Sequence, residues 1–144
     1  MPIALPATEV IPVNLSKLRG RTVVYVYRRT GVPDPGARGC TPQSCSFHDH
    51  FGELTRLGVA QLYGLSTQNT AYQKEAATRL HLPFAILSDE KLTLTRALNL
   101  PTFSTELKRM ALVIDDNTIT KVFYPVFPPD KNAAEVIAWL QRSR

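Results

Sequence analysis

A chain of 144 residues, 44% of them apolar and 20% charged, is long enough to bury a core and is not a disordered protein. Its net charge of +5 is modest and its lysines and arginines are scattered, so we do not expect nucleic-acid binding. Two cysteines are too few for a disulfide scaffold, which leaves both thiols available for chemistry. We expect one domain over residues 1–144.

The ends and the hydropathy of the chain give no sign of a membrane. The N-terminus lacks a basic start and has too short an apolar run for a signal peptide. No apolar segment approaches the roughly 20 residues that span a bilayer. We therefore expect a soluble cytoplasmic protein with no membrane partner, in a compartment where stable structural disulfides are unusual.

The first part of the chain predicts a buried strand followed by a long loop. Residues 1–15 contain three prolines and predict a loop or a short edge piece. Residues 14–20 could form one helical turn that is closed by Gly20. The apolar run at 22–27 predicts a buried strand. Three glycines and two prolines in residues 28–39 predict a loop with unusual backbone conformations.

From Thr41 the pattern becomes helical. Thr41 is an acceptable N-cap, and Pro42 suits the first helical position. Three apolar residues then recur at spacings of four and three, which places them on one face of a helix that stops at Gly58. These residues are Phe47, Phe51 and Leu54.

The remainder of the chain alternates strands and helices. The predicted elements are a strand at 59–65, a helix at 69–80, a strand at 83–87, a helix from Ser88 or Asp89, strands at 110–114 and 119–123 joined by a hairpin turn at 115–118, and a helix from Asn132. The buried stripe of this last predicted helix consists of Ala133, Val136, Ile137 and Leu140. Asn132 and Glu135 have the spacing of a capping box. This order predicts an α/β fold of the thioredoxin-like sandwich type, in which a central mixed β-sheet carries helices on both faces.

The two cysteines, Cys40 and Cys45, lie where the loop turns into the helix. A thiol near the start of a helix is favoured as thiolate, and a second thiol can capture its oxidised form. On one continuous helix their Cα atoms would lie roughly 8–9 Å apart, whereas a disulfide needs roughly 4.4–6.8 Å. The spacing therefore predicts one folded state with separate thiols and one locally unwound, cross-linked state.

The gap of four residues is wider than the CxxC motif of disulfide exchange. It suits a thiolate that first meets another oxidant, such as a peroxide, and then recruits its partner. The segment from Pro33 to Cys45 resembles the active site of peroxiredoxins, in particular the bacterioferritin-comigratory-protein or Q subgroup. In this resemblance Pro33 and Cys40 match the family pattern and Cys45 matches the resolving cysteine. The likeness continues through residues 47–49 and 87–90, and through Arg109 ahead of residues 112–115.

The resemblance implies a role for each matching residue. Cys40 would attack hydrogen peroxide or an organic hydroperoxide, and Cys45 would resolve the sulfenic acid as an intramolecular disulfide. Pro33 would shield and shape the pocket, and Arg109 would stabilise the thiolate and orient the peroxide. A thioredoxin-like partner would reduce the disulfide, no cofactor or metal would be needed, and the protein would act as a monomer or weak homodimer. The sequence departs from the family pattern at Ala37, where a Thr or Ser is expected.

Other interpretations of the two thiols stay open. The chain could be a dithiol–disulfide oxidoreductase, or a redox-sensing interaction module in which unwinding of residues 40–45 exposes a partner surface. Two thiolates are also half of a zinc site, to which only His48 and His50 lie close in sequence.

Overall fold

The computed structural model describes most of the secondary structure and leaves several connecting segments outside the description. The described residues are 4–5, 13–14, 20–27, 40–67, 70–79, 82–89, 102–103, 106–107, 110–116, 118–124, 126 and 131–142. Pro33, Ala37 and Arg109 lie outside these residues, as do the loop at 28–39 and the helix predicted from Ser88 or Asp89.

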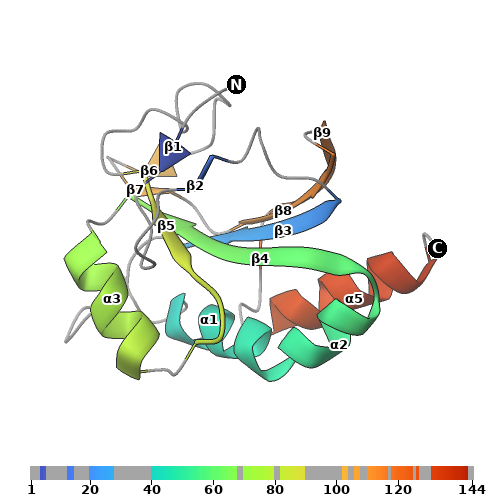
Figure 1. Ribbon diagram of the computed structural model, residues 1–144, viewed down its shortest axis with the longest axis horizontal. Coiled ribbons are helices and arrows are strands. Elements are labelled where there is room, and N and C mark those ends of the chain that lie inside the picture. Colours follow the sequence, from blue (N-terminus) through green and yellow to red (C-terminus); the bar gives the residue numbers. More distant parts are fainter. Residues whose placement is uncertain are drawn as a thin grey trace.

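A five-stranded mixed sheet forms the centre of the molecule (Figure 1). The strands are β3 (Arg21–Val26), β4 (Val59–Ser66), β5 (Ile86–Ser88), β8 (Met110–Asp115) and β9 (Thr118–Phe123), in the spatial order β5-β4-β3-β8-β9. β3, β4 and β5 are parallel, whereas β8 runs antiparallel to both β3 and β9. The alternation of strands and helices in the first half and the late hairpin predicted this arrangement.

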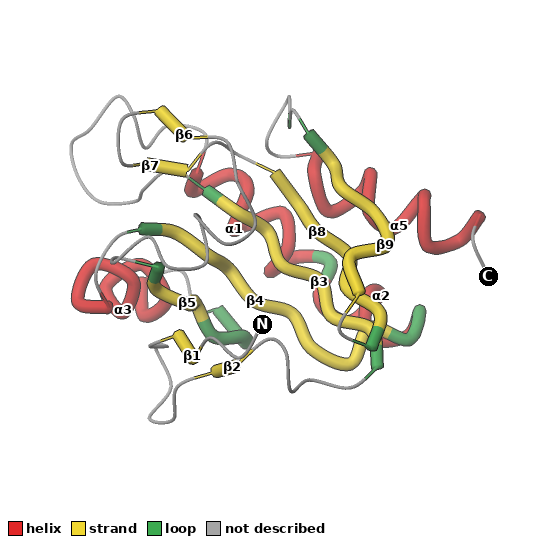
Figure 2. Tube along the Cα trace, turned by 90° about the horizontal axis from the view of Figure 1, so that it is seen from above, coloured by secondary structure: helices red, strands yellow, loops and turns green. Residues whose placement is uncertain are grey.

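The described helices lie on one side of this sheet (Figure 1). They are α1 (Cys40–Asp49), α2 (Phe51–Arg56), α3 (Thr70–Arg79) and α5 (Asn132–Arg142). Two short strand pairs lie outside the main sheet (Figure 2): β1 (Ala4–Leu5) with β2 (Val13–Asn14), and β6 (Thr102–Phe103) with β7 (Glu106–Leu107). None of the helices in the described ranges has the length and hydropathy that crossing a bilayer requires.

The central strand β3 is buried on both faces from Thr22 onward, which explains its uninterrupted apolar run from Val23 to Val26. Val23, Tyr25 and Tyr27 belong to the core between the sheet and the helices. Val24 and Val26 belong to a second core on the opposite face. The helical face predicted at Phe47, Phe51 and Leu54 packs into the first core, and so does the predicted stripe of α5, which consists of Ala133, Val136, Ile137 and Leu140.

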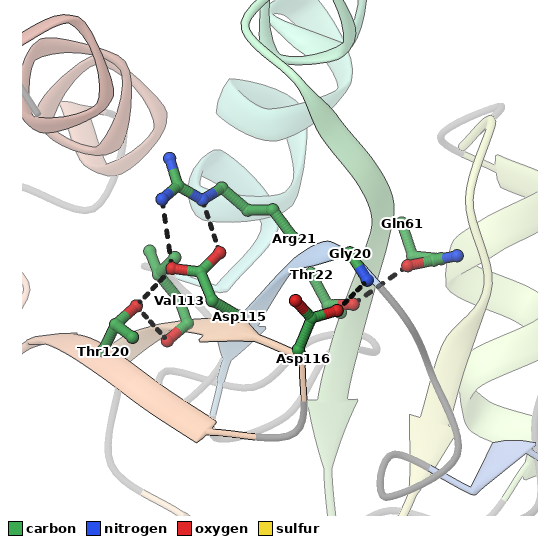
Figure 3. A network of polar contacts seen from close by, with 8 residues as sticks. All are labelled: Gly20, Arg21, Thr22, Gln61, Val113, Asp115, Asp116 and Thr120. Atoms are coloured by element: carbon green, nitrogen blue, oxygen red, sulfur yellow. Dashed lines mark hydrogen bonds and ion pairs between the residues drawn. The ribbon is translucent and has the colours of Figure 1, made fainter. Parts of the chain in front are cut away.

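The β8–β9 turn is joined to the start of β3 (Figure 3). Arg21 donates to the Asp115 carboxylate from Nε at 2.6 Å and from Nη2 at 3.0 Å, and Thr120 donates to it at 2.8 Å. Hydrogen bonds from Arg21 are the main reason that the pKa of Asp115 is lowered. Asp116, at a φ of 45°, accepts from the backbone N–H of Gly20 at 2.7 Å. The turn thus closes one end of the sheet, where β3 begins.

Two predicted helix details are wrong. The helix expected to run from Thr41 to Gly58 is divided at His50, whose ring Nδ1 lies 2.8 Å from the carbonyl oxygen of Ser46. The capping box expected at Asn132 is replaced by a cap from another helix. Ser46 Oγ of α1 accepts from the backbone N–H of Ala133 at 3.2 Å, while Asn132 Oδ1 accepts from a glutamine of α1.

Candidate active site

Both cysteines lie on one helix, as the spacing argument assumed. Cys40 is the first residue of α1, and the structure describes its backbone. Cys45 is a half-buried thiol in the second turn of the same helix. Because α1 is continuous from Cys40 to Asp49, regular helix geometry separates the two Cα atoms by roughly 8–9 Å. The described conformation is therefore the folded one, in which a disulfide between these residues cannot close.

The first turns of α1 are held at the end of β3 by a buried glutamine. Gln43 has no solvent exposure, and its Nε2 lies 3.3 Å from the carbonyl oxygen of Val26 and 3.4 Å from that of Met110. The same Nε2 lies 3.0 Å from Asn132 Oδ1 in α5. The two backbone carbonyls require a donor, which sets the orientation of the Gln43 amide. No donor among the described residues reaches Gln43 Oε1.

This glutamine also places the active-site helix beside the start of β8. Met110, the first residue of β8, follows Arg109 directly in the sequence. Through the contact between Gln43 and the Met110 carbonyl, α1 therefore lies against the residue that follows Arg109 in the sequence. Arg109 itself and Pro33 lie outside the described residues, so their predicted roles stay predictions.

A tyrosine of the sheet supports the residue next to Cys45. Tyr25 donates its hydroxyl hydrogen to Ser44 Oγ at 3.0 Å, and both groups are buried. The Tyr25 ring stacks on Phe47 with centroids 4.7 Å apart and meets Phe84 edge-on at 5.6 Å. The ring passes so close to β4 that a Cβ at Gly64 would lie 2.8 Å from its Cζ and hydroxyl oxygen. A glycine at this position is what lets the ring reach α1.

The two histidines near Cys45 make contacts of their own. His48 Nδ1 lies 3.0 Å from Asp49 Oδ1, and His50 Nδ1 lies 2.8 Å from the Ser46 carbonyl oxygen. Within the described part of the chain, no three His, Cys, Asp or Glu side chains converge in a way that could hold a metal ion.

Comparisons with known proteins identify the family. A model of the Redoxin family matches residues 2–137. A chloroplastic peroxiredoxin Q of Sedum lineare is 33% identical over 144 residues, covering 97% of this chain and 74% of that protein. The chain belongs to the peroxiredoxin Q group. A chloroplastic peroxiredoxin Q of Oryza sativa subsp. japonica is 35% identical over 133 residues. That alignment covers 90% of the present chain and 58% of the rice protein.

Solved structures agree with this assignment. The peroxidoxin BcpB of Mycobacterium tuberculosis superimposes with a TM-score of 0.83 at 26% identity, covering 99% of this peroxiredoxin and 93% of that chain. The likeness confirms the predicted thioredoxin-like fold with its mixed sheet. Membership of the peroxiredoxin Q group supports a thiol-dependent peroxidase activity.

The sequence pattern did not predict the polar residues that anchor this peroxiredoxin's α1. Gln43, Ser44 and Ser46 are all buried, although the helical pattern assigned only apolar residues to the inner face. One signal was present: the first two turns of the helix contain no large apolar side chain, yet they follow a fully buried strand. A helix of that kind must bury polar groups, and these need partners.

Proposed function

We propose that this peroxiredoxin reduces hydrogen peroxide or organic hydroperoxides with Cys40 as the nucleophile and Cys45 as the resolving thiol. The observation that carries the proposal is the placement of both residues on α1, with Cys40 at its first position. The partial positive charge at the start of a helix stabilises a thiolate there and lowers its pKa. The thiolate is the form that attacks a peroxide.

The chemistry proceeds in two steps. The Cys40 thiolate attacks one peroxide oxygen and the O–O bond breaks, which leaves a sulfenic acid on Cys40 and releases an alkoxide or hydroxide that takes up a proton. The Cys45 sulfur then attacks the sulfenic sulfur, a disulfide forms and water leaves. Arg109, with its forked and permanently charged donors, would stabilise the thiolate and orient the peroxide, and Pro33 would shield the pocket.

The second step requires α1 to open. Disulfide geometry allows Cα atoms roughly 4.4–6.8 Å apart, so the first turn of the helix has to unwind before Cys45 reaches Cys40. This intramolecular bond would make the protein an atypical 2-Cys peroxiredoxin. Both thiols come from one chain, so a monomer or a weak homodimer would suffice. The disulfide would be returned to dithiol by a thioredoxin-like reductant, in a reducing compartment such as the cytoplasm.

Intact mass after one equivalent of hydrogen peroxide tests the proposal. We expect the reduced protein to lose about two mass units as the disulfide forms. The Cys45→Ser variant should gain one oxygen or more, and the Cys40→Ser variant should keep its mass. A Cys40→Ser protein that consumes peroxide at the parental rate would overturn the assignment. Reduction of insulin without peroxide turnover would instead support a dithiol–disulfide oxidoreductase.

A further inference from the structure

In the sequence, Gln43 lies between Cys40 and Cys45, and its side chain joins α1 to three other elements. Its fully buried amide contacts the last residue of β3, Val26, the first residue of β8, Met110, and the first residue of α5, Asn132. None of these acceptors belongs to α1. The contact to Asn132 Oδ1 is the shortest at 3.0 Å, and the amide has two hydrogens for three acceptors.

The position of Gln43 in the sequence connects these contacts to the redox cycle. A Cys40–Cys45 disulfide closes a loop in which Gln43 is one of only four intervening residues. The helix cannot unwind through this segment while the amide stays bound to β3, β8 and α5. Ser44, which accepts from Tyr25, adds a further contact to the same segment.

We propose that Gln43 is a positioning residue whose hydrogen bonds keep α1 folded and thereby set the rate at which Cys45 resolves the Cys40 sulfenic acid. The inference rests on the proposed function. While the amide is bound, Cys45 cannot reach the Cys40 sulfenic acid, which therefore persists. A second peroxide can then oxidise it to sulfinic acid, with the peroxide reduced to water or an alcohol. Gln43 therefore governs how readily the enzyme is inactivated by its own substrate.

The chain offers a matched control for this residue. Gln73 in α3 is likewise fully buried, and its Nε2 donates to Ser66 Oγ at 2.9 Å and to the Leu87 carbonyl at 2.8 Å. Its Oε1, like that of Gln43, has no donor among the described residues. Gln73→Ala thus removes the same side chain and comparable hydrogen bonds, but from a helix without a cysteine.

Rapid-quench intact mass of the full-length reduced protein measures the step directly. With one equivalent of hydrogen peroxide, Gln43→Ala should form the disulfide about fivefold faster than the parent, the factor expected from one buried hydrogen bond. With excess peroxide it should accumulate a smaller fraction of sulfinic acid. Gln73→Ala should match the parent in both readouts, even where it lowers the Tm. Equal rates in Gln43→Ala and the parent, or equal acceleration in both variants, would overturn the proposal.

A second variant covers the case in which Gln43→Ala does not fold. Asn132→Ala removes only the shortest of the three contacts and leaves both backbone carbonyls as acceptors. It should accelerate disulfide formation in the same direction, about twofold; no acceleration in this variant would count against the role of Gln43. The Cys45→Ser variant gains oxygen on Cys40 whether or not Gln43 acts in this way, so the two proposals can fail separately.

Discussion

Tyr25 of β3 donates a hydrogen bond to Ser44 of α1, the residue immediately before Cys45. The central strand therefore supports the active-site helix through a buried polar contact as well as through apolar packing. Tyr25→Phe keeps the ring stacked on Phe47 and removes only the hydroxyl. We expect the free energy of unfolding to fall by about 1 kcal/mol, as measured by urea denaturation. Tyr124 is 46% exposed, so Tyr124→Phe is the control and should change the free energy of unfolding by less than about 0.5 kcal/mol.

The close approach of Gly64 to the Tyr25 ring predicts a second stability effect. A Cβ placed 2.8 Å from ring atoms forces the ring or the strand to shift, so Gly64→Ala should destabilise the fold by about 1–3 kcal/mol. In α2, a Cβ at Gly52 would meet no atom within 4 Å. Gly52→Ala should therefore stabilise the protein by about 0.5–1 kcal/mol. Thermal or urea unfolding of the two variants should give opposite signs, and the same sign in both would contradict the packing argument.

The cap that Ser46 supplies to α5 predicts a loss of stability in Ser46→Ala. The variant leaves the backbone N–H of Ala133 buried without its acceptor, and we expect a cost of about 1 kcal/mol in urea denaturation. Thr55→Ala is the comparison, because Thr55 Oγ1 donates to the Phe51 carbonyl of its own helix in an exposed position. It should change stability by less than about 0.5 kcal/mol. An equal loss in both variants would exclude a special role for the cap.

The Arg21–Asp115 pair predicts a loss of stability in acid. Hydrogen bonds from Arg21 lower the pKa of Asp115 below its unfolded value of about 3.9, so the folded protein binds this proton more weakly. The contribution is complete above about pH 5 and disappears as the pH falls through the lowered pKa. The two side chains are 26% and 29% exposed, so we expect about 1 kcal/mol or less.

Asp115→Asn isolates this pH effect. The difference in the free energy of unfolding between the parent and the variant should shrink between about pH 6 and pH 3. Asp49→Asn, at an exposed carboxylate of α1, serves as a control for a general change in charge. A difference for Asp115→Asn that stays constant or grows on acidification would contradict the lowered pKa.

The sequence predicted those features that depend on neighbouring residues. The apolar run of β3, the face formed by Phe47 and Leu54, and the β8–β9 turn each follow from local periodicity or turn composition. The placement of Cys40 and Cys45 at the start of a helix was predicted from the Gly- and Pro-rich segment before them and from Thr41 and Pro42. At the division between α1 and α2 the His50 ring contacts the carbonyl of Ser46, a contact that no periodicity encodes.

The anchoring of α1 could not be predicted in this way. Met110 and Asn132 lie 67 and 89 residues from Gln43, and the pattern of a single helix says nothing about partners so distant. A glutamine in a helix is usually solvated. Gln43 is buried because the end of β3, the start of β8 and the start of α5 meet at its side chain, which only the tertiary structure reveals.

The contacts of Ser46 and Gln43 with α5 also bear on the order in which the molecule is made. During synthesis α1 emerges before α5, and α5 holds Asn132 and Ala133, the residues that bond to Gln43 and Ser46. A nascent chain that ends before α5 therefore lacks the shortest contact of the Gln43 amide. The contacts that anchor the helix with the two cysteines are complete only after α5 has been synthesised and has docked.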